Sequence, residues 1–220
     1  MTKAGKTSIT LVLDRSGSMD AVRGETIQGV NKFLAEQKNL PGEATFTLVQ
    51  FNHRYEMVCL DQPLEQVPPL TEDTYVPDGY TALLDAVGRT ISALGQRLAM
   101  MPEAERPEKV IFVIQTDGQE NHSKEYSYER ICEMIQHQRD KYAWEFLFLG
   151  ADESTIQVAE AMGIPQGAAL QYAACPRGVS RLFSTAAAAV TDRRRGLRSR
   201  DTMFTEEERQ ANRGQGNGQA

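Results

Sequence analysis

The chain has 220 residues, of which 40% are hydrophobic and 25% charged, and its formal net charge is -6. This length fits one α/β domain with a tail, and the acidic balance argues against a generic nucleic-acid-binding protein, because such proteins carry a basic excess. No apolar stretch reaches the length needed to cross a bilayer, and the polar N-terminal residues lack the apolar region and cleavage site of a signal peptide.

The cysteines support an intracellular setting. Cys59, Cys132 and Cys175 are odd in number, far apart and without Cys-x-x-Cys spacing. This pattern is typical of reduced thiols. We therefore expect a cytoplasmic protein with no membrane partner.

Strand-like and helix-like segments alternate along the chain, a pattern typical of a mostly parallel sheet with helices on both faces. We expect strands at 8–13, 45–51, 55–60, 109–116, 144–149 and 168–172. We expect helices at 20–38, 81–101, 128–142, 153–162 and 176–192. The segment 61–80 contains four prolines and is expected to be a long surface loop without a helix.

The connection between the second and third strands sets the sheet topology. Residues 52–54 are too few for a parallel crossover, so this pair should form an antiparallel hairpin at one edge. The predicted fold is an α/β, doubly wound, mostly parallel six-stranded sheet in the order 3-2-1-4-5-6, with one antiparallel edge strand and helices on both faces.

The composition changes at Arg193. An arginine-rich run (193–200) is followed by glutamates and by an end rich in Gly, Asn and Gln. We assign residues 1–192 to the domain and expect residues 193–220 to form a charged, disordered tail, with a transient helix at 203–209 as the alternative there. The arginine run is interpreted as a solvated surface, and its contact with acidic protein or nucleic acid is a second possibility.

Oxygen-bearing side chains follow two central strands and begin one helix. Asp14, Ser16 and Ser18 follow the first strand, Asp117 ends the fourth, and Thr81 starts the second helix. The carboxyl ends of parallel strands share one edge of a sheet, and ligands bind where the strand order reverses, so these five side chains should converge. Hydroxyl and carboxylate oxygens suit Mg²⁺, with Mn²⁺ or Ca²⁺ as alternatives. The positive ends of two helices would point at such an ion and leave its charge poorly neutralised, which favours an anionic ligand.

These residues resemble a known family. Asp14-x-Ser16-x-Ser18, Thr81 after Gly79-Tyr80 and Asp117 before Gly118 are similar, in order and in strand context, to the metal-ion-dependent adhesion site (MIDAS) of von Willebrand factor type A (vWA) domains. The resemblance covers residues 8–192. It is closest to small intracellular bacterial or phage members, because no second adhesion-type domain or secretion signal is visible.

The resemblance implies a role for each residue. Ser16 and Ser18 would bind the ion directly, Thr81 directly or through water, and Asp14 and Asp117 mainly through water. A glutamate or aspartate of a partner protein would complete the coordination sphere. The integrin-like activation machinery of the family is not carried over.

Purely structural roles are the alternative interpretation of these residues. Ser and Asp are common helix caps, which would explain Asp14, Ser16 and Ser18 taken alone. The three histidines show no zinc-ligand spacing. Several further residues could line the rim of the site or serve only as turn, cap and loop residues: Asp78, Asp85, Glu120, Asn121, His122, Asp152 and Glu153.

Three functional hypotheses follow. The first is a metal-dependent protein-binding module that is not an enzyme. The second is a regulatory or adaptor subunit that recruits a larger assembly, such as an ATPase or a phage complex, through its tail. The third is a metal-dependent phosphohydrolase with Asp14 as nucleophile, which lacks the second acid or base that such chemistry needs because the position two residues on is Ser16.

Overall fold

The computed structural model describes residues 2–213, and its centre is one six-stranded sheet in the order β3-β2-β1-β4-β5-β6. The strands are β1 (Lys3–Asp14), β2 (Ala44–Phe51), β3 (Tyr55–Pro63), β4 (Pro107–Thr116), β5 (Glu145–Gly150) and β6 (Ala169–Gln171). Only the β2–β3 pair is antiparallel among the pairings of this sheet. The predicted strand order and the antiparallel hairpin are therefore confirmed.

The described chain also contains six α-helices and four short 3-10 turns, and two of the helices, α5 and α6, follow the last strand. The helices are α1 (Arg23–Lys38), α2 (Leu83–Ala99), α3 (Tyr128–Tyr142), α4 (Glu153–Ala161), α5 (Pro176–Arg194) and α6 (Glu206–Arg213). The 3-10 turns are η1 (Gly17–Val22), η2 (Leu64–Gln66), η3 (Glu103–Glu105) and η4 (Gln166–Ala168). Over residues 2–213, no helix combines the length and the apolar character that crossing a membrane requires.

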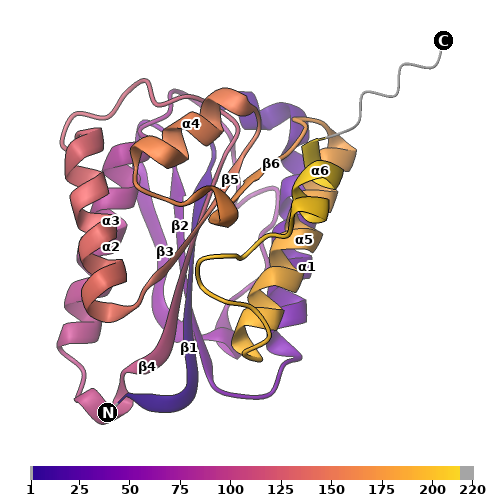
Figure 1. Ribbon diagram of the computed structural model, residues 1–220. Coiled ribbons are helices and arrows are strands. Elements are labelled where there is room, and N and C mark those ends of the chain that lie inside the picture. Colours follow the sequence, from indigo (N-terminus) through magenta and orange to yellow (C-terminus); the bar gives the residue numbers. More distant parts are fainter. Residues whose placement is uncertain (1, 214–220) are drawn as a thin grey trace.

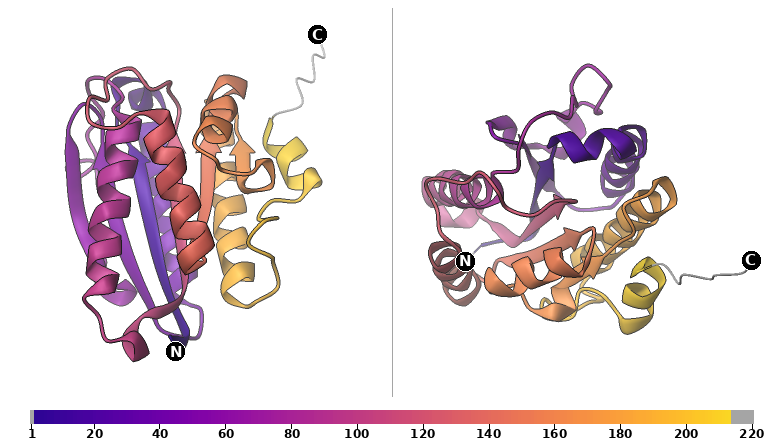
Figure 2. Two further views of the ribbon diagram at one scale, coloured as in Figure 1. Left: turned by 60° about the vertical axis from the view of Figure 1, so that its left-hand side comes forward. Right: turned by 90° about the horizontal axis from the view of Figure 1, so that it is seen from above.

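The helices form two layers around the sheet (Figures 1 and 2). Helices α1 and α5 pack against each other on one face, and α2, α3 and α4 cover the other. The central parts of β1 (residues 9–13) and β4 (residues 110–114) are consequently buried on both faces, which is why all their residues except Thr10 are apolar. Their carboxyl ends, Asp14 and Thr116, lie at the point where the strand order reverses.

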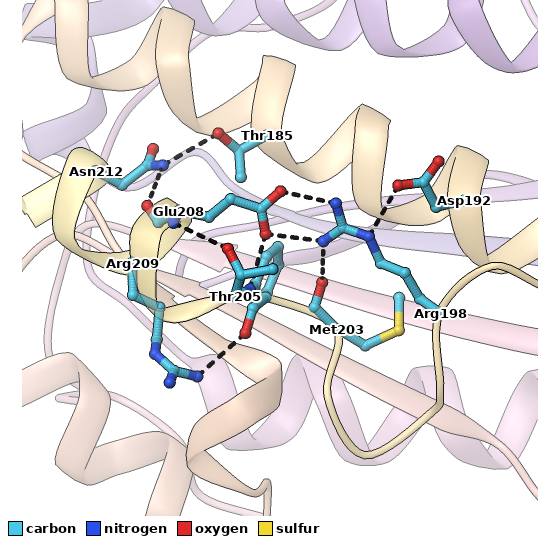
Figure 3. Close-up of polar contacts among 9 residues, drawn as sticks. Thr185, Asp192, Arg198, Met203, Thr205, Glu208, Arg209 and Asn212 are labelled. Atoms are coloured by element: carbon cyan, nitrogen blue, oxygen red, sulfur yellow. Dashed lines mark hydrogen bonds and ion pairs between the residues drawn. The ribbon is translucent and has the colours of Figure 1, made fainter.

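The structure differs from the prediction of a disordered tail. Residues 195–213 lie along α5 and β6, and they end in α6 (Figures 1 and 3). Met203 and Phe204 are fully buried, and the Phe204 N–H donates to the Gly167 carbonyl. These two apolar residues supply an anchor that the polar composition of the tail conceals. Residues 214–220 lie outside the described residues, and the domain boundary at residue 192 stays a prediction.

One arginine holds this segment in place (Figure 3). The Arg198 guanidinium donates to both carboxylate oxygens of Glu208 at 2.7 and 2.8 Å, to Asp192 at 3.0 Å and to the Met203 carbonyl at 2.6 Å. Charge-assisted, two-pronged bonds of this kind fix geometry as well as adding stability. Part of the arginine run is therefore engaged within the protein.

Candidate metal centre

Asp14 lies at the buried bottom of the candidate site. Its side chain ends β1, is fully inaccessible to solvent, and accepts hydrogen bonds from two neutral donors. The Ser16 N–H donates to Oδ1 at 2.6 Å, and the Thr116 hydroxyl donates to Oδ2 at 2.5 Å. The Tyr75 hydroxyl donates to the Asp14 backbone carbonyl at 2.6 Å. The carboxylate is thus held rigidly at the end of two neighbouring strands.

A series of polar contacts runs from Asp14 and Ser16 toward the protein surface. Ser16 Oγ lies 3.2 Å from Ser18 Oγ, and the Ser18 hydroxyl donates to Asp117 Oδ1 at 2.7 Å. Ser16 is buried, Asp117 half-buried and Ser18 exposed, so the cluster opens toward solvent. The Ser16 side chain makes no capping bond to η1, although this residue occupies the N-cap position. Helix capping therefore does not account for Ser16.

Thr81 completes the group from a different part of the chain. It is buried and lies two residues before α2, not within the helix as predicted. A Cβ added at Gly118 would lie 3.4 Å from Thr81 Oγ1 and 3.9 Å from Ser18 Oγ, so both hydroxyls border the same glycine. The structure therefore brings together all five residues that the sequence singled out.

Both carboxylates in this small space have raised pKa values. Burial raises the pKa of Asp14 to about 7, although the hydrogen bonds from Thr116 and Ser16 oppose the rise and the nearby Asp117 adds to it. Burial also raises the pKa of Asp117, with a further contribution from the charge of Asp152. Removing an anion from water is unfavourable unless a counter-charge accompanies it.

The donor set fits a small, hard cation. Among residues 2–213, no Lys or Arg side chain pairs with Asp14 or Asp117, so a bound cation would supply the missing counter-charge. The same part of the chain contains no group of three or more His, Cys, Asp or Glu that could hold a metal ion. A cation at this point would therefore be held by hydroxyls together with two carboxylates, which suits an oxygen-preferring ion.

Sequence reasoning did not assign a role to the carboxylates that position Thr81. Glu120 accepts from the Leu84 N–H at the start of α2 and from the N–H groups of His122 and Ser123. Asp85 accepts from three further backbone N–H groups, those of residues 124–126. These bonds fasten the loop after β4 to the first turn of α2. No local sequence signal could reveal them, because most of the partners are 36–41 residues apart.

The same loop holds the Thr81 backbone directly. The Thr81 N–H donates to Asn121 Oδ1 at 2.9 Å, and the Thr81 carbonyl accepts from the N–H groups of Asn121 and His122. Asn121 is thus a positioning residue for Thr81.

The remaining rim candidates have structural roles. Asp152 caps α4 through a reciprocal bond pair with Thr155, as the plainer interpretation predicted, and Glu153 follows it exposed on the first turn. Asp78 is an exposed turn residue whose carbonyl accepts from the Asn52 side chain. Both segments border the site without a hydrogen bond to its five residues among those described.

Comparison with known proteins identifies the fold. No protein-family model matches the sequence, and no curated protein matches it. Among solved structures, the vWF domain of the type V pili tip protein Mfa5 from Porphyromonas gingivalis superposes with a TM-score of 0.62 at 9% identity, covering 88% of this chain and 96% of that one. A von Willebrand factor type A structure from Catenulispora acidiphila gives 0.53 at 17% identity, covering 84% of this chain and 43% of that one.

A third similar structure was solved with a metal bound to it. Proximal thread matrix protein 1 from the mussel byssus, solved with a zinc-occupied MIDAS motif, gives a TM-score of 0.56 at 14% identity, with coverage of 83% and 48%. This chain spans less than half the length of the mussel and Catenulispora proteins. At these identities the likeness shows the fold, and the fold is that of a vWA domain.

Proposed function

We propose that this protein is a vWA-type binding module that holds a divalent cation, Mg²⁺ in the first instance, and uses it to capture a carboxylate of a partner protein. Ser16 and Ser18 would bind the ion directly, Thr81 directly or through water, and Asp14 and Asp117 mainly through water. The observation that supports this most strongly is the continuous polar chain Asp14–Ser16–Ser18–Asp117 at the switch point of the sheet.

The charge of the site indicates which group of a partner would bind the cation. The five residues carry two negative charges at most, and neither acid has a cationic side chain as a partner within residues 2–213. An Mg²⁺ ion held mainly by neutral hydroxyls keeps enough charge to attract another anion. A partner protein that inserts an Asp or Glu side chain supplies that anion.

The competing hypotheses receive less support. In the adaptor hypothesis the arginine run recruits a larger assembly, but Arg193 pairs with Glu145, and Arg198 with Asp192 and Glu208. In the phosphohydrolase hypothesis Asp14 attacks a substrate, but its carboxylate is fully buried beneath Ser16. We therefore propose a binding module that is not an enzyme. A cytoplasmic location and a likeness to bacterial or phage members stay predictions.

The proposal is tested by removing the two serine hydroxyls. The double variant Ser16→Ala, Ser18→Ala should lose calorimetric Mg²⁺ and Mn²⁺ binding and keep the circular dichroism spectrum of the wild type. The matched control Ser180→Ala, Ser184→Ala changes two serines on α5, on the opposite helix layer from α2, and should bind both ions like the wild type. Unchanged metal affinity in the first variant would overturn the proposal.

A further inference from the structure

An exposed aromatic ring stands beside the candidate metal centre. Tyr80, the residue before Thr81, keeps 64% of its surface accessible to solvent. Its ring stacks on the His122 imidazole with centroids 5.3 Å apart and an interplanar angle of 15°. The His53 ring meets His122 edge-on at 6.2 Å. An exposed tyrosine supported in this way is a typical anchor for a binding partner.

The backbone holds this ring in a fixed position relative to the five site residues. The Gly79 carbonyl accepts from the Gly17 N–H at 3.1 Å, between Ser16 and Ser18, and the His122 N–H donates to the Thr81 carbonyl at 3.1 Å. Gly79 has φ +72, and a Cβ there would lie 2.1 Å from His53 Nδ1. Only glycine therefore allows His53 to pack against this turn. The stack and the hydroxyl cluster form one rigid surface.

The charges around this surface are mostly negative. Asp20, Asp78, Asp152 and Glu153 are exposed on the segments that border the site, and no Lys or Arg within residues 2–213 forms an ion pair with any of them. The exposed cations on the neighbouring loops are Arg54 and Lys124. The bound cation would attract a partner's carboxylate, but these surrounding acids oppose its approach, and positive charge carried next to that carboxylate would offset their repulsion.

We propose that the Tyr80–His122 stack is a second contact point for the partner, and that it accepts an arginine side chain carried next to the metal-binding carboxylate. This inference rests on the proposed function. A guanidinium group lies flat on an aromatic ring and is attracted by its face, which at an exposed site corresponds to about threefold in affinity. Asp78, two residues before Tyr80, adds attraction for the same positive charge.

Synthetic peptides test this geometry without knowledge of the natural partner. Each peptide carries blocked ends, one aspartate in a Gly/Ser background and one arginine placed one, two or three residues to either side. A matched set replaces arginine with citrulline, its neutral isostere, and a third set replaces it with leucine. Binding to the ¹⁵N-labelled full-length protein is followed by NMR titration in excess Mg²⁺ and again in excess chelator.

We expect at least one arginine placement to bind about threefold more tightly than its citrulline counterpart, in Mg²⁺ only. The variant Tyr80→Leu should reduce this ratio to one, and Tyr80→Phe should restore it because the aromatic face is kept. The matched control is Tyr142→Leu. Tyr142 is 60% exposed, and its ring centroid lies 5.7 Å from that of His137, but it ends α3 just before β5 begins, at the amino end of that strand and away from the site. It should leave the ratio unchanged.

The outcomes separate the two proposals. If no aspartate peptide binds in an Mg²⁺-dependent manner, the proposed function fails and this inference fails with it. If aspartate peptides bind with Mg²⁺ but arginine gives no advantage over citrulline, only the contact point proposed for Tyr80 is overturned. That contact point is also overturned if the arginine advantage survives Tyr80→Leu, or if the leucine peptides bind best.

Discussion

Replacing Asp14 with asparagine should stabilise the metal-free protein at neutral pH while removing its affinity for a divalent cation. Burial raises the pKa of Asp14 from 3.8 to about 7, so folding takes up a proton between these two pH values. The free energy of unfolding therefore falls as the pH rises from about 4 to about 7. Integrated over this interval, the shift corresponds to about 4 kcal/mol of lost stability above pH 7.

The asparagine side chain can occupy the same place without the charge. Its Oδ1 keeps the bond from the Ser16 N–H, and its amide can donate to Thr116 Oγ1, because that hydroxyl has the Gly118 carbonyl at 3.1 Å as an alternative acceptor. In chelator at pH 8 we expect Asp14→Asn to be more stable than the wild type by up to about 4 kcal/mol, and at pH 4 the two should converge.

Added Mg²⁺ should narrow this difference in stability between the two proteins. A ligand at one hundred times its dissociation constant stabilises a protein by about 2.7 kcal/mol, which the wild type gains and the variant does not. Urea unfolding from pH 4 to pH 8.5 measures the free energy of unfolding of both proteins, in chelator and in Mg²⁺. The buried Trp144, the single tryptophan of the chain, is the fluorescent reporter. A variant that is less stable than the wild type in chelator at pH 8, or that gains equal stability from Mg²⁺, would refute this reasoning.

Three further substitutions probe the parts of the protein that support the site and the C-terminal segment. Arg198→Met leaves Glu208 without its cation, so we expect the free energy of unfolding in urea to fall by about 2 kcal/mol and tryptic cleavage in the segment 195–209 to be faster. Cleavage at the wild-type rate would show that Arg198 does not hold this segment against the domain. Phe204→Ala removes a fully buried ring, so the free energy of unfolding should fall by about 3 kcal/mol, or the segment should detach fully. In either case the amides of α6 should lose hydrogen-exchange protection. Asp85→Ala leaves three backbone N–H groups without their acceptor, so Mg²⁺ affinity in calorimetry should fall about tenfold through the displaced Thr81, whereas an unchanged affinity would show that this loop does not position the site.

The strand ends explain why the fold and the convergence of five polar side chains could be predicted. In β1 a nearly all-apolar run, broken only by Thr10, ends at Asp14, and in β4 a run of five apolar residues ends three positions before Asp117, so the burial and the approximate carboxyl end of each strand are visible in the sequence. The three-residue connection at 52–54 indicates the antiparallel edge in the same local way. Local patterns of this kind need no knowledge of distant contacts.

Other features depend on contacts that no local pattern encodes. The Thr116 hydroxyl bonds to Asp14 across 102 positions of sequence, and Glu120 reaches the start of α2 across 36. The raised pKa of Asp14 follows from burial by surrounding elements, which the sequence around residue 14 does not specify. The prediction of a disordered tail is wrong for the described C-terminal segment because two buried side chains, Met203 and Phe204, outweigh a charged composition.

A crystal grown in excess Mn²⁺ and measured at the manganese absorption edge would show whether these five residues hold a cation. We expect one anomalous density peak at the carboxyl end of β1, about 2.2 Å from the hydroxyl oxygens of Ser16 and Ser18, with Asp14 and Asp117 facing it mainly through water. A map without a peak at this position, in which the Ser18 hydroxyl still donates to Asp117, would contradict it.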